Sequence, residues 1–216
     1  MKSLSLLLAS LLITGAVHAQ APATADKLPG VKVRVKGVEV EEQQTPMLQV
    51  SNVKMKRWNP KNWIEIDVEF DIKLPESAGG RKGSYAGMTM NVYVVLQHMT
   101  KETPPKREVL TGTLELLDIP ADEPCHALAY IAPATLKSIF QKDFVTASSD
   151  IQGWGVEFIA EGQVVATKSS IPMKSGKPWW EENKDAFAMM PNMVLNKMQT
   201  PFAAVFGDYD VPVRVK

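Results

Sequence analysis

A cysteine followed directly by a histidine, Cys125-His126, is the first pair in the chain whose residue types could do chemistry. An imidazole that deprotonates a thiol makes a strong nucleophile, but neighbouring residues of an extended chain point to opposite faces. His98 is the remaining histidine beyond the first nineteen residues, and no motif relates it to Cys125. Zinc needs three or four ligands at a recognisable spacing. We therefore predict no catalytic residue, no metal site and no cofactor.

Cys125 is the one cysteine of the chain, so an internal disulfide is impossible. We interpret it as a buried small residue. An intermolecular half-bridge and a reactive thiol are the alternatives.

Methionines and tryptophans indicate two possible ligands. Thioethers select Cu(I), but methionine is also ordinary core filler. Indoles stack on sugar rings, yet they also dominate core packing. We favour packing for both groups and keep copper and glycan binding as alternatives. The residues concerned are Met88, Met90, Met99, Met189, Met190, Met193, Met198, Trp58, Trp63, Trp179 and Trp180.

Residues 64–72 alternate strictly between five apolar side chains and four carboxylates. This period of two predicts a strand with one buried and one wet face. The carboxylates invite a calcium hypothesis, but side chains about 7 Å apart along one strand do not converge on an ion. We favour a solvated face in which cross-strand lysines pair with the carboxylates.

Valines alternate with charged residues near both ends of the chain. Residues 31–36 read Val-Lys-Val-Arg-Val-Lys, Gly37 interrupts, and 38–41 continue with acidic partners, while 211–216 nearly repeat the first motif. Pro212 lacks an N–H group, which puts that terminal strand at a sheet edge. In one interpretation, both segments are edge strands whose charges discourage aggregation. In the other, the terminal strand adds to the sheet of a neighbouring subunit. The candidate interaction strands carry Val31, Val33, Val35, Val211, Val213 and Val215.

Further strands are predicted at about ten-residue intervals, which is typical of a sandwich. These strands cover 88–97, 108–117, 154–160 and 164–166, the last two joined by a turn at Glu161-Gly162. A short helix is expected over 133–140, with Pro133 or Ala134 in its first turn. Near-helical spacing of apolar residues predicts a second helical segment over 179–199, divided at Pro191.

The chain ends and the charge balance limit the function classes. Residues 1–19 have the charge, apolar run and small-residue ending of a signal peptide, and 20–30 read as a flexible tether. Residues 31–216 then form a single domain. With 24 basic and 24 acidic residues the chain is neutral, so nucleic acid is excluded as a partner. No second apolar run is long enough for a membrane helix.

Two segments carry a family resemblance. One is the hairpin of residues 150–170, with Gly153-Trp154-Gly155-Val156-Glu157-Phe158, and the other is the tail from Leu195 to Ala203 and on to Asp208-Tyr209. The chain resembles exported immunoglobulin-like proteins of Verrucomicrobia, one of which lies in a gene cluster for type IV pilus-like assembly. The cysteine pair of antibody domains is absent. The resemblance implies an adhesive, pilus-associated or envelope-structural role and no catalytic residues.

Taken together, the sequence predicts a mainly β protein, an immunoglobulin-like antiparallel β-sandwich with short helical C-terminal additions. We expect it to be exported, to the periplasm or the cell surface, and to act as a non-enzymatic interaction or structural protein. Its expected partners are other envelope or pilus proteins, and a homo-oligomer is possible. A periplasmic carrier of copper or glycan is the alternative.

Overall fold

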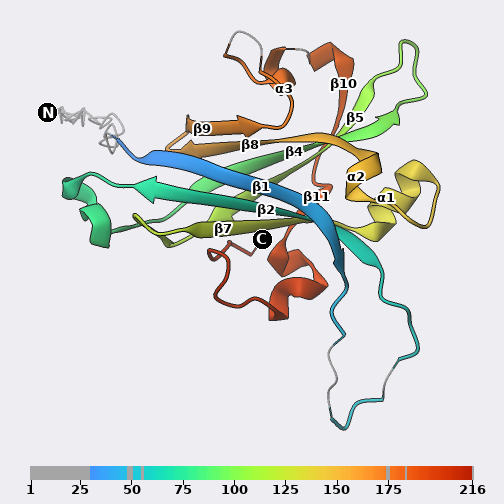
Figure 1. Cartoon of the computed structure of the whole chain (residues 1–216), viewed down its shortest axis with the longest axis horizontal. Coiled ribbons are helices and arrows are strands. Elements are labelled where there is room, and N and C mark those ends of the chain that lie inside the picture. The colour runs from blue at the N-terminus through green and yellow to red at the C-terminus, as the bar shows by residue number, and fades with distance from the viewer. Residues whose placement is uncertain (1–29, 48–50, 55, 174–175, 183, 216) are drawn as a thin grey trace, which may run out of the picture.

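A computed structural model describes residues 30–47, 51–54, 56–173, 176–182 and 184–215 (Figure 1). The predicted signal peptide, 1–19, and the predicted tether up to residue 29 lie outside the described residues. Within the described ranges, no helix combines the length and the apolar character needed to cross a membrane.

The first of two large sheets is fully antiparallel and has β1 at one edge. Its strand order is β1-β2-β7-β11. The strands are β1 (Lys32–Gln44), β2 (Asn62–Lys73), β7 (Cys125–Ile131) and β11 (Val194–Asn196). The longest of them, β1, pairs on one side with β2 and shifts register by a bulge between Val35 and Gly37.

The second sheet is mixed, with the strand order β10-β5-β4-β8-β9. The strands are β4 (Met88–Met99), β5 (Arg107–Leu116), β8 (Ile151–Ala160), β9 (Gln163–Ser169) and β10 (Phe187–Met190). Only the β10–β5 pair among them is parallel, so the expectation of a purely antiparallel fold is corrected at this edge. The chain reaches β10 by a long connection through α3 (Trp179–Glu182), which permits the parallel direction. A small third sheet joins β3 (Ser84–Tyr85) to β6 (Ile119–Pro120).

The core lies between the two large sheets, as Figure 1 shows in the layered arrangement of β1, β2 and β7 against β4 and β8. The five apolar side chains predicted for 64–72 are at most 1% exposed and fill this space from β2. Phe70 of β2 meets Phe158 of β8 with ring centroids 4.9 Å apart. Each such side chain contributes about 1.5–3 kcal/mol when it leaves water, so this one strand supplies a large part of the core.

The predicted helix over 133–140 is confirmed as α1 (Pro133–Phe140). Pro133 occupies the first turn, and Gln141 ends the helix in the left-handed conformation with φ 55°. A further short helix, α2 (Ala147–Asp150), leads directly into β8. The predicted hairpin at Glu161-Gly162 is also confirmed, because both residues have positive φ angles and join β8 to β9.

The helical segment predicted for 179–199 is wrong for most of its length. The α-helix ends at Glu182, and β10 and β11 replace the expected continuation. Pro191 disfavours a helical Met190, and Asn192 turns the chain with φ 60°. The two strands then pair with the open edges of β5 and β7, where backbone groups need partners.

Trp179 and Trp180 cover the outer face of the second sheet. Trp180 stacks on Tyr93 with ring centroids 4.5 Å apart, and both tryptophans are only 4% exposed. The Trp179 indole N–H donates to the Ser169 hydroxyl at 2.9 Å. This packing depends on Gly155, because a Cβ there would lie 2.1 Å from Trp180 Cζ3.

Replacing Gly155 with alanine should therefore expel Trp180 from its stack on Tyr93. Overpacking of this kind costs about 1–3 kcal/mol of unfolding free energy. Denaturant unfolding followed by tryptophan fluorescence measures the loss. Gly207→Ala is the matched control, because a Cβ at Gly207 meets nothing within 4 Å. Equal stability of the two variants would contradict the proposed role of Gly155.

Candidate interaction surfaces

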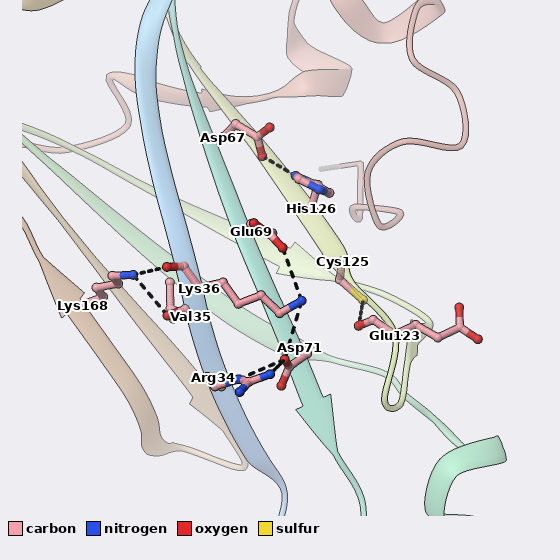
Figure 2. A network of polar contacts seen from close by, with 10 residues as sticks. All are labelled: Arg34, Val35, Lys36, Asp67, Glu69, Asp71, Glu123, Cys125, His126 and Lys168. Carbon is pink, nitrogen blue, oxygen red and sulfur yellow. Dashed lines mark hydrogen bonds and ion pairs between the residues drawn. The ribbon is translucent and has the colours of Figure 1, made fainter.

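Cys125 and His126 lie on opposite faces of β7, as the extended geometry predicts. The thiol is buried in the core between the sheets and points toward the carbonyl oxygens of Glu123 and Pro120, at 3.6 and 3.8 Å. The His126 ring lies on the outer face, with Nδ1 2.8 Å from Asp67 Oδ1 (Figure 2). His98 instead contacts Glu108, with 2.7 Å between Nδ1 and Oε2. The structure therefore does not bring a thiol and an imidazole together at Cys125.

Burial is the main cause that raises the pKa of Cys125 to about 11, and the nearby carboxylates of Glu123 and Asp71 add to it. The thiol therefore stays protonated in the folded protein at neutral pH, which agrees with its interpretation as a buried residue.

Two of the four carboxylates of β2 are buried, so the expectation of a solvated face is wrong in part. Glu65 and Asp71 are only 8% and 7% exposed. At one end of β2, Asp71 accepts hydrogen bonds from the Arg34 guanidinium, at 2.6 and 3.1 Å. Lys36 lies 3.3 Å from Glu69 and 3.8 Å from Asp71, so the expected cross-strand lysine pairing is present there (Figure 2).

Near the middle of β2, the C-terminal segment lies against the sheet. The Tyr209 hydroxyl donates to Asp67 Oδ2 at 2.6 Å, and its ring stacks on His126 with centroids 4.3 Å apart. Burial is the main cause that raises the pKa of Tyr209, and the hydrogen bond to the Asp67 carboxylate adds to it, so the phenol remains a donor. The cluster fastens the C-terminal segment to the sheet. Sequence reasoning missed it, because residues 67, 126 and 209 share no local pattern.

Beside this cluster lies a buried layer that the sequence also did not reveal. Phe202 stacks on Tyr130 of β7 with centroids 4.6 Å apart, and Trp63 contacts the Phe202 ring edge-on. Burial under this layer raises the pKa of Glu65, whose register partner on β7 is Tyr130. Lys197, itself 4% exposed, holds the segment in place through Asp210 at 2.5 Å.

The methionines and tryptophans separate into buried and exposed groups. Met88 and Met90 are in the core, whereas Met99, Met189 and Met198 are about 40% exposed or more. The expectation that the methionines pack in the core therefore fits Met88 and Met90 best. Across the described ranges, no cluster of three or more His, Cys, Asp or Glu side chains is arranged to hold a metal ion.

One open groove is lined by aromatic and proline side chains. It lies where the connection from β1 to β2 meets α1, and Trp58 and Trp63 form part of its wall. Trp58 is 49% exposed. Trp179 and Trp180 are packed on the second sheet, so their indoles cannot stack on a sugar ring. The cations in the lining are Lys56, Arg57 and Lys61.

The predicted interaction strand near the N-terminus is the edge strand β1. Val31, Val33 and Val35 are half-buried and pack against the core, so their side chains face inward. At its edge opposite β2, β1 has no described strand hydrogen-bonded to it as a sheet neighbour, although β9 of the second sheet lies close by. Lys168 of β9 donates to the carbonyl oxygens of Val35 and Lys36 at this edge (Figure 2).

The second predicted interaction strand, 211–216, makes internal contacts over most of its described residues, and its role in association stays a prediction. Val211 is 6% exposed and its N–H donates to the His126 carbonyl at 2.9 Å. Val213 packs against the core and pairs with Leu116, while Val215 is 64% exposed. Pro212 accepts from the Leu117 N–H at 2.7 Å, so its carbonyl supports an internal contact. The segment closes the fold, and of the two predicted interaction strands β1 has the edge position in the first sheet.

The protein is mainly β and has two layers, because two large sheets face each other across one core. One protein-family model matches residues 24–216, and the chain belongs to the family that this model describes. A solved structure of a protein from Akkermansia muciniphila is similar in fold, with a TM-score of 0.72 and 21% sequence identity. The similarity covers 87% of this chain and 95% of that chain. No curated protein matches the chain significantly.

The raised pKa of Cys125 predicts a slow thiol reaction in the folded protein. Near neutral pH the thiolate fraction should be about a hundredfold below that of an ordinary cysteine, since two pKa units separate them. Ellman's reagent should react slowly with native protein and rapidly in denaturant, with Cys125→Ser as the blank. A native thiol that reacts as fast as the unfolded one would contradict the buried, protonated state.

Proposed function

We propose that this chain is an exported, non-enzymatic interaction protein of the cell envelope with an immunoglobulin-like architecture. It associates through β1 with a second copy of itself, and in that form it takes part in an envelope or pilus assembly. The pilus-related part is supported by the resemblance of the tail 195–209 to exported proteins of Verrucomicrobia.

The strand order supports the immunoglobulin-like architecture. In immunoglobulin domains, strands A, B and E share one sheet and strands C′, C, F and G the other. Assigning β1, β2 and β7 to the first set, and β5, β4, β8 and β9 to the second, reproduces the observed neighbours. The Phe70–Phe158 pair then joins strands B and F, the strands that a disulfide connects in antibody domains.

The segregated charge along β1 is the observation that carries the association. Lys32, Arg34 and Lys36 are exposed on its first half, and Glu39 and Glu41 on its second. The bulge at Gly37 separates the halves. Within the chain, Glu39 and Glu41 face Asp67 and Glu65 of β2, which are like charges. The second half of β1 is therefore suited to a basic partner strand.

A second copy supplies such a strand if the two β1 strands pair antiparallel about a two-fold axis near Gly37. Lys36 then faces Glu39 of the other copy and Arg34 faces Glu41, and symmetry repeats both pairs. Four opposite-charge pairs of about 0.2–1 kcal/mol each favour this register over its alternatives. The side chains that face inward, such as Val35 and Val40, also meet in this alignment.

Charge reversal tests the register. The double variant Glu39→Lys, Glu41→Lys should weaken self-association by roughly one to two orders of magnitude, because both halves of β1 become basic. Mixed with a copy carrying Arg34→Glu and Lys36→Glu, it should form a heterodimer. Sedimentation velocity measures association, and thermal unfolding verifies that each variant is folded. Unchanged self-association of the first variant, or a wild-type chain that is monomeric at all concentrations, would overturn the proposal.

Lys168 provides an independent check, because its ammonium caps two carbonyl groups that a partner strand needs. Lys168→Ala should strengthen self-association by exposing these acceptors. Lys101→Ala, which removes an exposed lysine on another loop, is the matched control and should leave association unchanged.

Export and envelope association are tested by cell fractionation with protease treatment of intact cells. We expect the chain in the periplasmic or surface fraction, shortened by cleavage after Ala19. Surface fibres sheared from the cells should contain it if the pilus-related role holds. Recovery of the full-length chain in the cytoplasm would refute export and envelope association. The charge-reversal experiment would still test self-association through β1.

A further inference from the structure

We propose that the described residues of the connection between β1 and β2, 45–47, 51–54 and 56–61, form a docking surface for an anionic lipid bilayer. The described residues that carry this function are Met47, Val53, Lys54, Lys56, Arg57, Trp58 and Lys61. The inference uses none of the residues assigned to self-association and holds whether or not that association occurs.

The first observation is the local charge. Four cations, Lys54, Lys56, Arg57 and Lys61, lie in this connection, and residues 45–61 include no Asp or Glu. The whole chain is neutral, so the excess is a property of this loop. All four cations are exposed. A concentrated positive charge on a projecting segment is attracted to a surface of anionic headgroups.

The second observation is the exposure of apolar side chains beside these cations. Met47 is 66% exposed, Val53 61% and Trp58 49%, and all three lie in the same connection. Figure 1 shows the described parts of this connection extending away from the two sheets, at the end of β1 opposite its start. Side chains of this kind on a projecting loop can enter the boundary between headgroups and acyl chains. Tryptophan in particular is enriched at that depth.

The third observation is how the base of the loop is held. The Thr45 N–H and hydroxyl both donate to the Lys61 carbonyl, at 3.0 and 2.9 Å. The Trp63 indole N–H donates to the Thr45 hydroxyl at 3.1 Å. These bonds close the loop against the edge of the first sheet. Its two arms therefore leave the domain together and can present one combined surface.

The combination of side chains selects a bilayer over other anionic partners. A nucleic acid or polyanion would engage the cations through its phosphates or carboxylates and would leave Met47 and Val53 without a role. A bilayer uses both sets, because lysine and arginine extend toward the headgroups while the apolar groups enter below them. An acidic protein surface is the competing partner, and the experiment below distinguishes it.

Vesicle co-sedimentation tests the proposal with the purified protein and phosphatidylcholine vesicles made with and without phosphatidylglycerol. We expect binding only to the vesicles that contain phosphatidylglycerol, with affinity falling as salt rises. Lys56→Glu with Arg57→Glu should abolish binding. Trp58→Ala should weaken it by about tenfold while leaving its salt dependence in place. In the wild type, lipids carrying a bromine quencher on the acyl chain should reduce Trp58 fluorescence, measured as the difference from Trp58→Ala.

The matched control is Lys82→Glu with Lys101→Glu, which changes the net charge equally at two exposed lysines outside the loop. This variant should bind nearly as well as the wild type, and thermal unfolding establishes that all variants are folded. Absence of vesicle binding by the wild type would overturn the proposal, as would an equal loss in the control variant. Binding to soluble polyglutamate that Trp58→Ala does not weaken, without vesicle binding, would also overturn it and would indicate an acidic protein surface.

Discussion

The side chains of β2 alternate between a core of apolar groups and a row of carboxylates, and both faces are covered by other parts of the chain. Glu65 Oε2 is buried without a hydrogen-bond partner among the described residues. Removing the other carboxylates from water is costly without partners, and the elements around β2 supply cations and donors to them. Arg34 and Lys36 of β1 do so at one end, and His126 and Tyr209 do so further along. The register of β1 and the path of the C-terminal segment both follow from this requirement.

The same requirement leaves charge unevenly distributed along the edge of the first sheet. The cations of β1 lie opposite Glu69 and Asp71, where they neutralise carboxylates. Beyond the bulge, Glu39 and Glu41 lie opposite carboxylates instead. In the proposed association, the partner strand of β1 is acidic where β1 is basic and basic where β1 is acidic. The antiparallel copy of β1 has this polarity by symmetry. In this proposal, the charge pairing that stabilises the domain also favours one edge contact over others.

Local sequence patterns predicted those strands and helices whose formation depends on interactions within the segment itself. The alternation at 64–72 and the proline at the start of 133–140 were sufficient for β2 and α1, because burial and φ restriction act within each segment. The segment 179–199 was not predictable in this way, since β10 and β11 exist only because β5 and β7 offer open edges. The Asp67–His126–Tyr209 cluster and the Lys168 cap likewise join distant residues. For the surfaces, β1 was recognised from its alternation, but the role of 211–215 in closing the fold depends on contacts with β5 and β7.

The two proposed surfaces constrain each other geometrically. The loop 45–61 follows the end of β1, and an antiparallel pair of β1 strands has its two ends on opposite sides of the two-fold axis. The two loops of such a dimer therefore point away from each other. A flat bilayer can meet only one of them at a time, because docking of one loop directs the other toward solvent or a second surface. Self-association through β1 would then link two anionic surfaces, or one surface and an envelope assembly, rather than double the contact with a single membrane.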